Sequence, residues 1–281
     1  MSAPVRVERP ASAAAAQALR AAAPDVVFVA GGTALQLAWT QGAPAGLTLV
    51  DVARLPGAQG ITLAPAGRPG LRIGAAVTLE ALRLDERVVR VAPMLAQVCA
   101  EIGSLPVRTW GTLGGNAGWR YGDALAVLLV LQARVELADG SVRPLEDWLA
   151  AEPLPLAVAF HLDGPAAPAS PCWYEKIGQR EAFAPSMLTL AQAGGRVAAV
   201  AAGLPARRLR RTEACLAGRP VAASVWAAAL QADLDDDGVA GVRVPVGPAD
   251  VRWRASAARR LLLGHSRSSL DDPAPPAAPS T

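Results

Sequence analysis

The sequence has few of the residues that enzymes most often use for chemistry. Two histidines, three cysteines and one lysine occur among 281 residues, and aromatic residues make up only 4%. The histidines and cysteines are scattered, with no Cys-x-x-Cys pair, so no metal-ligand cluster is visible. A Gly-x-Ser-x-Gly motif is also absent, which argues against a nucleophile–base arrangement. We therefore expect neither a metal site nor a catalytic residue in this chain.

Strong charge and long apolar runs are missing as well. The net charge is +3 and no long basic run occurs, so we expect no nucleic-acid partner. The longest apolar run, residues 124–131, is far shorter than the ~20 residues that a membrane-spanning helix needs. The Ala-rich N-terminal segment is interrupted by Gln17 and Arg20, so it predicts a helix and not a secretory signal. Scattered cysteines suit buried free thiols in a reducing compartment. These observations predict a cytoplasmic protein without membrane insertion.

Hydrophobic periodicity and turn residues predict a mixture of helices and strands. The segment 163–171 is rich in Pro, Ala, Gly and Ser and is the expected domain boundary. The Pro- and Ser-rich segment 264–281 is expected to be disordered. Expected helices cover residues 10–23, 35–39, 79–84, 88–101, 124–131, 204–216, 221–232 and 256–263, and expected strands cover residues 26–29, 47–51, 71–75, 133–137 and 157–162.

Two glycine-pair turns are the most informative features of the chain. The first, Gly31-Gly32-Thr33, follows the β-branched run 26–29, and the second is Gly111-Thr112-Leu113-Gly114-Gly115-Asn116. Glycine lacks a Cβ atom, so the backbone amides of such turns can come close to an anion, and amides at a helix start are unpaired. The alternative for the first turn is a plain strand-to-helix connection. Two turns of matching design predict a cradle of amides for both phosphates of a dinucleotide.

The two commonest nucleotide-binding motifs are absent. No G-x-G-x-x-G follows a predicted strand, and no Gly-Lys pair occurs anywhere in the chain. These absences exclude the Rossmann fingerprint and the P-loop.

Three polar residues accompany the glycine turns. Asn116 carries an amide that can reach a ring or a phosphate. Asp123 could accept hydrogen bonds from ribose hydroxyls, although its position alone favours simple N-capping of the helix at residues 124–131. Lys176 is the one lysine beside 26 arginines. A compact ammonium could stabilise negative charge on a reduced flavin, and the alternative is a surface lysine without a role.

At this point the sequence resembles a known family. Residues 30–35 and 111–116 resemble the two flavin-binding signatures of the FAD-binding (medium) subunit of the molybdenum hydroxylases, of the bacterial xanthine dehydrogenase and carbon monoxide dehydrogenase type. Further segments match in the same order along nearly the whole chain, and they are residues 73–82, 174–180, 203–218 and 250–261.

The resemblance implies an α+β fold. A two-lobed, PCMH-like FAD-binding domain would comprise residues 1–56 and 57–163, followed by a smaller α/β C-terminal domain at residues 172–263 and a disordered tail at residues 264–281. The two lobes would clasp an extended FAD, and the C-terminal domain would cover the flavin.

The resemblance also implies a set of cofactor-binding residues. Ile102 would pack by the isoalloxazine, Asp123 would meet the ribose or adenine side, and Lys176 would approach the flavin ring. Ala34 stands where the family usually has an acidic residue, and the loop at residues 117–122 is shorter than usual. The pyrophosphate would be wrapped by two segments, Phe28, Val29, Ala30, Gly31, Gly32, Thr33, Ala34 and Leu35, and Thr112, Leu113, Gly114, Gly115 and Asn116.

In the family, such a subunit transfers electrons. Electrons from a molybdenum centre would pass through iron–sulfur clusters to FAD and then to NAD or another acceptor. The molybdenum–pterin cofactor would lie on a large partner subunit and the [2Fe-2S] clusters on a small one, because this chain lacks the ligands. Two alternatives remain, namely a self-contained flavin oxidoreductase with its own substrate cavity, and a flavin-free subunit that bridges others.

Overall fold

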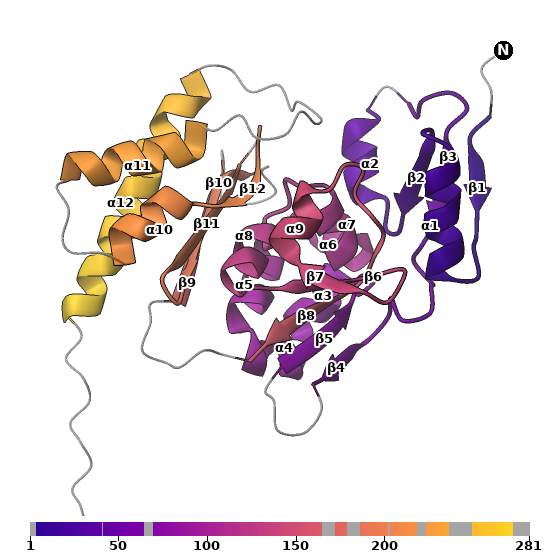
Figure 1. The fold of residues 1–281 in the computed structure, drawn as a ribbon, viewed down its shortest axis with the longest axis horizontal. Coiled ribbons are helices and arrows are strands. Elements are labelled where there is room, and N and C mark those ends of the chain that lie inside the picture. The colour runs from indigo at the N-terminus through magenta and orange to yellow at the C-terminus, as the bar shows by residue number, and fades with distance from the viewer. Residues whose placement is uncertain are drawn as a thin grey trace, which may run out of the picture.

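We describe the fold from a computed structural model of the chain. The structure describes residues 4–40, 42–64, 70–164, 172–178, 186–201, 203–217, 223–235 and 249–271. Three β-sheets with their helices lie in a row, with the N-terminal part at one end and the C-terminal part at the other (Figure 1). The mixed helix and strand content agrees with the expected α+β fold.

The first part is a three-stranded parallel sheet of order β1-β3-β2 with two helices. Its elements are β1 (Arg6–Glu8), α1 (Ala13–Ala22), β2 (Val26–Val29), α2 (Thr33–Ala38) and β3 (Thr48–Asp51). The predicted strand at residues 26–29 is confirmed. The predicted helix at residues 35–39 in fact starts two residues earlier, directly after the first glycine turn. Strand β1 was not predicted, because three residues alternating between charge and valine give too short a pattern.

The second part is a five-stranded antiparallel sheet of order β4-β5-β8-β6-β7. Helices bury one face of this sheet in the largest hydrophobic core of the described chain. The strands are β4 (Ile61–Leu63), β5 (Gly70–Gly74), β6 (Arg134–Leu137), β7 (Val142–Pro144) and β8 (Ala157–Asp163), and the helices are α3 (Leu79–Leu84), α4 (Glu86–Val91), α5 (Pro93–Glu101), α6 (Leu105–Trp110), α7 (Leu113–Gly118), α8 (Ala124–Val130) and α9 (Leu145–Ala150).

The prediction of one long helix over residues 88–101 is wrong. The chain forms α4 and α5 instead, with Ala92 between them in a non-helical conformation. Pro93 is the first residue of α5. Proline fits the first turn of a helix, but it disfavours a helical conformation at the residue before it. A proline within a helical pattern therefore ends one helix and starts the next.

The third part is a four-stranded antiparallel sheet of order β12-β11-β10-β9. Three helices pack on one face of it, and the other face packs on the second part. Strands β10 and β11 were not predicted, because both faces are buried and their alanine-rich sequences show no alternation. The elements are β9 (Cys172–Gly178), β10 (Ser186–Ala193), β11 (Arg196–Ala201), β12 (Leu204–Arg208), α10 (Arg210–Ala217), α11 (Ala223–Asp235) and α12 (Ala249–Asp271).

Two further predictions in the third part are wrong. Residues 204–208 of the predicted helix 204–216 form the edge strand β12, and the helix starts only at Arg210. The predicted disordered tail begins too early, because α12 continues to Asp271. Residues 272–281 of that tail lie outside the described residues, as does most of the predicted domain boundary, residues 165–171.

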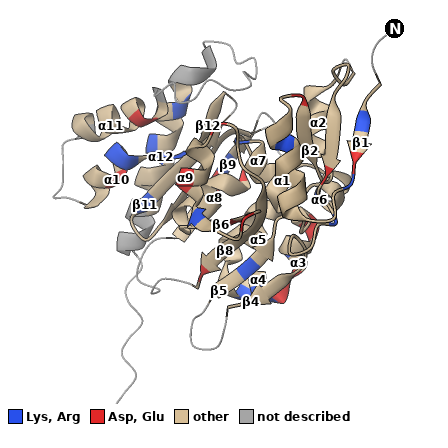
Figure 2. Ribbon diagram, turned by 45° about the vertical axis from the view of Figure 1, so that its right-hand side comes forward, with Lys and Arg blue, Asp and Glu red and all other residues tan. Residues whose placement is uncertain are grey.

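Helix α8 connects the second and third parts. Every one of its seven residues is buried, and its neighbours include α5 and α7 on one side and β10, β11 and β12 on the other. The hydrophobic core that contains α8 also includes Ala191, Ala198 and Val200 of the third sheet. Helix α8 carries no charged residue (Figure 2). The two parts therefore share one core.

The state of the cysteines differs from the prediction of three buried thiols. All three are free, but only Cys99 is buried, while Cys172 is exposed and Cys215 lies between these extremes. Burial raises the pKa of the Cys99 thiol to about 12. No helix in the described chain has both the length and the apolar character to cross a bilayer.

Candidate functional site

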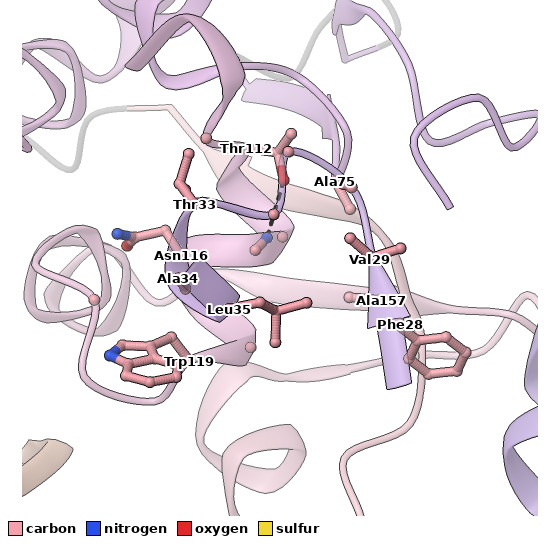
Figure 3. A pocket seen from close by; sticks show the side chains of 18 of the residues that line it. Phe28, Val29, Thr33, Ala34, Leu35, Ala75, Thr112, Asn116, Trp119 and Ala157 are labelled. Atoms are coloured by element: carbon pink, nitrogen blue, oxygen red, sulfur yellow. Dashed lines mark hydrogen bonds between the residues drawn. The ribbon is translucent and has the colours of Figure 1, made fainter. Parts of the chain in front are cut away.

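A cleft of about 1070 Å³ is lined by residues of all three parts. It contains both glycine turns together with Ile102 and Asp123, which flank the second turn in sequence, and Lys176, which is distant from both turns. Of the sixteen residues that the sequence nominated, only Leu113 does not line the cleft. The fold thus brings fifteen of them to one place, and Figure 3 shows several of their side chains around the opening.

The first glycine turn presents a row of free backbone amides. Gly32 has φ +68° and is the N-cap of α2 without any side-chain cap. No hydrogen bond from the amides of residues 31–35 exists within the described chain, and the first amide of α2 with an acceptor is that of Gln36, which donates to Gly32 O at 3.0 Å. Buried or half-buried amides normally have partners. Five consecutive donors without acceptors therefore mark a place for an anionic or acceptor-rich ligand.

The two glycine turns are in direct contact. A Cβ atom on Gly31 would lie 1.7 Å from Trp110 O, and one on Gly111 would lie 3.2 Å from Thr33 Oγ1. Any side chain at position 31 would therefore collide with the backbone of the second turn. The glycine at this position is required for the two turns to meet, in addition to any approach to a ligand.

The second turn differs from the first, and the expectation of two matching amide cradles is wrong in this respect. The amides of Leu113, Gly114 and Asn116 donate to Val77 O (2.9 Å), Ala75 O (2.7 Å) and Thr112 O (2.9 Å). The amide of Gly115 donates to Thr112 Oγ1 at 3.1 Å (Figure 3). These donors are used inside the protein because the turn caps α7 and pairs with the loop before α3.

The second turn contributes side chains to the cleft. Leu113 has a fully buried side chain in the core, so it anchors the turn. Asn116 lines the cleft, and its Oδ1 atom is buried without any hydrogen-bond partner. Gly122 makes room for it, since a Cβ atom there would lie 2.3 Å from Asn116 Oδ1. An orphaned polar atom of this kind fits a site that a polar ligand completes.

Lys176 and Asp123 form an ion pair in the cleft wall. The distance from Lys176 Nζ to Asp123 Oδ2 is 2.8 Å, and each side chain is 10% exposed. Lys176 Nζ also donates to Glu101 O at 2.8 Å, and Thr189 Oγ1 donates to Asp123 Oδ1 at 2.9 Å. The side chain of Asp123 makes no cap bond to α8. Lys176 is therefore not a surface lysine, and the side chain of Asp123 does not act as the N-cap of α8.

This pairing bears on the roles that the resemblance implies. Lys176 was assigned to the flavin ring and Asp123 to the ribose or adenine side, but the two side chains touch. Ile102 ends α5 directly after Glu101, whose carbonyl binds Lys176. The Tyr174 hydroxyl donates a hydrogen bond to Glu101 Oε1 at 2.5 Å. Burial is the larger cause that raises the pKa of Tyr174, and the hydrogen bond to the Glu101 carboxylate is the second. Ile102, Asp123 and Lys176 thus lie at one end of the cleft.

Several lining residues were not found from the sequence. Arg120 has φ +62°, and its guanidinium donates to Leu149 O at 2.5 Å and Ala151 O at 2.7 Å, which holds the loop after α7. Trp119 and Arg20 also line the cleft, and Trp119 lies on the side of Asn116, opposite Phe28 (Figure 3). No sequence signal identifies them, because their place depends on how the parts pack. The described residues contain no group of three or more His, Cys, Asp or Glu side chains that could hold a metal ion.

Comparison with known proteins agrees with this geometry. The family described as the FAD binding domain in molybdopterin dehydrogenase matches residues 3–155. No curated protein sequence gives a significant match. The whole fold is similar to three solved structures, each covering 96% of this chain and 99% of the other at 20% identity. They are carbon monoxide dehydrogenase from Hydrogenophaga pseudoflava (TM-score 0.76), reconstituted CO dehydrogenase from Oligotropha carboxidovorans (0.75) and quinoline 2-oxidoreductase from Pseudomonas putida 86 (0.69).

Proposed function

We propose that this chain, which belongs to the family of FAD-binding domains of molybdopterin dehydrogenases, is the FAD-carrying electron-transfer subunit of a molybdenum hydroxylase. The observation that carries the proposal is the glycine turn whose amides 31–35 have no acceptor in the described chain and line the large cleft. A diphosphate is the part of FAD that needs such a row of donors.

The residues present suit FAD in three ways. The free amides of residues 31–35 would hold the diphosphate. Asn116 Oδ1 would gain a donor from a ligand hydroxyl or ring N–H. Ile102 would lie against the isoalloxazine, and Lys176 would direct its ammonium toward that end while Asp123 fixes its position. FAD, when bound, accepts single electrons and releases them as a pair. The protein itself supplies the binding, the orientation and the exclusion of water.

The wider assignment follows from the relatives and is part of the proposal. The molybdenum–pterin cofactor would be held by a large partner subunit and the [2Fe-2S] clusters by a small one, as in a complex of the xanthine dehydrogenase or carbon monoxide dehydrogenase type. NAD or another acceptor would take the electrons from this chain. The complex would be cytoplasmic. The FAD-binding domain would comprise one lobe that ends at residue 56 and a second lobe that ends at residue 163.

Flavin loading of the purified chain tests the proposal. The protein should copurify with, or take up, one FAD per chain, giving the visible absorbance of oxidised flavin that is released as FAD on denaturation. A chain that stays colourless with added FAD, alone and with its partners, would overturn the assignment. It would instead favour the flavin-free bridging role.

A second measurement separates the electron-transfer subunit from a self-contained oxidoreductase. The complex purified through this chain should contain molybdenum, iron and flavin together, and the isolated chain should not oxidise organic substrates of molybdenum hydroxylases. Turnover of such a substrate by the isolated flavin-loaded chain, or a native complex lacking molybdenum and iron, would contradict the proposal.

A further inference from the structure

We infer that Thr189 is a positioning residue for the end of the cleft that contains Ile102, Asp123 and Lys176. Thr189 fixes the Asp123 carboxylate, and through it the Lys176 ammonium, and thereby raises the reduction potential of the bound flavin. This inference rests on the proposed function, because it concerns how strongly the cofactor of that site attracts electrons.

The fold places Thr189 and Lys176 directly opposite each other. They form one cross-strand pair in the antiparallel ladder of β10 and β9, and the side chains of such a pair stand on the same face of the sheet. Lys176 Nζ lies 2.8 Å from Asp123 Oδ2, and Thr189 Oγ1 donates to Asp123 Oδ1 at 2.9 Å. Each oxygen of the carboxylate has its own donor, so the carboxylate cannot rotate without losing one of them.

The Thr189 hydroxyl reaches the cleft only through Asp123. Thr189 is fully buried, and its Oγ1 atom lies 2.8 Å from Ser186 Oγ. A threonine hydroxyl has one hydrogen, which Thr189 gives to Asp123, so Ser186 is the donor in the second contact. Asp123 and Lys176 are among the described residues that line the cleft, whereas Thr189 and Ser186 are not.

The Lys176 ammonium has one N–H group left for a ligand. It has three such groups, and the described chain offers it two acceptors, Asp123 Oδ2 at 2.8 Å and Glu101 O at 2.8 Å. The position of the Asp123 carboxylate therefore helps to determine where the third N–H group points. Because Thr189 fixes that carboxylate, it also orients the group that Lys176 presents to the cleft.

The direction of the effect follows from the charges. A positive charge beside a flavin ring favours the reduced ring, which carries negative charge. Without the Thr189 hydroxyl, Asp123 Oδ1 would lose its donor and the carboxylate would be free to turn. Its negative charge would then be less compensated, and a charge in a buried site acts more strongly than it does in water. Added electrons would be disfavoured, so the reduction potential would fall.

The midpoint potential of the FAD-loaded full chain, measured with dithionite and reference dyes, tests the inference. Thr189→Val keeps the shape of the side chain and removes the hydroxyl. At a fixed potential, the ratio of reduced to oxidised flavin should fall about 3- to 10-fold, and a tenfold change corresponds to about 30 mV for a two-electron couple. Thr189→Ser keeps a hydroxyl and should restore the potential. An unchanged potential in folded Thr189→Val would overturn the inference.

Thr212→Val is the matched control. Thr212 is also fully buried, and its Oγ1 atom donates to Asp233 Oδ2 at 2.9 Å, but neither of these described residues lines the cleft. The same substitution thus removes the same kind of hydrogen bond elsewhere in the third part. The flavin potential should be unchanged in Thr212→Val. An equal shift in both variants would show a general loosening of the third part and would overturn the role of Thr189.

The outcomes separate this inference from the proposed function. An unaltered chain that does not bind FAD contradicts the proposed function itself, whereas a normal potential in FAD-loaded Thr189→Val overturns the positioning role alone. Should Thr189→Val fail to fold, Thr189→Cys replaces it, because a thiol is a weak donor. Its potential should shift in the same direction by a smaller amount, and an unshifted potential in that variant would contradict the inference.

Discussion

The pair of Lys176 and Asp123 is the most consequential contact at the scale of single residues. Both side chains are nine-tenths buried, and they join a strand of the third part to the start of α8. Lys176→Met would leave the Asp123 carboxylate buried without its countercharge. Removing one partner of a buried pair costs about 3–5 kcal/mol, so we expect a loss of this size in the free energy of unfolding, measured by urea denaturation.

A double-mutant cycle provides the control for this prediction. Asp123→Asn with Lys176→Met removes both charges and should recover part of the stability lost in Lys176→Met alone. Additive effects of the two substitutions would show that the ion pair contributes nothing beyond the separate side chains.

Gly31 gives a second prediction at this scale. Gly31→Ala places a Cβ atom 1.7 Å from Trp110 O, so the two glycine turns must move apart. We expect loss of FAD binding, together with a destabilisation of several kcal/mol because backbone atoms collide. Gly264→Ala, in α12 outside the cleft and with nothing within 4 Å of the added Cβ atom, should bind FAD normally in the same titration.

The sequence predicted which residues line the cleft better than what each one does there. The glycine turns stood out because adjacent glycines follow a strand, and Lys176 because it is the one lysine in the chain. Whether an amide is free depends on partners far away in sequence, such as Ala75 O for Gly114. The difference between the two turns was therefore invisible before the fold was known.

At the scale of elements, Glu80 links α3 to α6. Its carboxylate accepts from Arg83 Nη2 at 2.5 Å and from Arg108 Nε at 2.8 Å. The hydrogen bonds from Arg83, and then those from Arg108, lower the pKa of Glu80 to about 2. Arg108 also donates to Gly103 O at 3.0 Å, so this cluster holds the helix that leads into the second glycine turn.

The lowered pKa of Glu80 predicts how stability depends on pH. A carboxyl group with a depressed pKa stabilises the fold above its ordinary value of 4.5, and this contribution is lost as the pH falls from about 4.5 toward 2. At pH 7, Glu80→Gln should be less stable than the unaltered chain by on the order of 1 kcal/mol. The difference, measured by urea denaturation from pH 7 to pH 3, should shrink below pH 4.5. A difference that stays constant with pH would contradict this assignment.

Elements were predicted where a local pattern decides the structure. The helix at residues 79–84 and the strand at residues 26–29 match the structure residue for residue. Strand β12 was missed because it runs directly into residues 209–216, where Leu209 and Leu216 have helical spacing, and it is the pairing with β11 that selects the strand. Pro205 is tolerated there because β12 is an edge strand.

At the scale of the whole molecule, the third part cannot be separated cleanly from the second. The apolar side chains of α8 pack on both, and Ala191 and Val200 of the third sheet belong to the same core. A chain ended at residue 164 would expose one side of α8 to water. We expect this shortened protein to bind the dye ANS and to aggregate in size-exclusion chromatography, whereas a compact monomer without dye binding would show that the first two parts are self-sufficient.

The order of the motifs carried the prediction of the whole fold. Short matches from residue 30 to residue 261 pointed to the family, and the family implied a molecule of three parts. The shared core could not be predicted in this way. The run Ala124–Val130 has no polar face, which indicates burial on all sides, but nothing in the sequence says which two sheets bury it.

The burial of α8 on all sides also determines how fast its backbone amides exchange with solvent. Its backbone amides can exchange with deuterium only when the hydrogen bonds of the helix open, and because α8 is buried between the second and third parts this opening requires the shared core to unfold, so these amides should be among the last in the molecule to exchange. Their exchange rate thus reports the opening of the entire assembly, and any ligand that holds the three parts together should slow it.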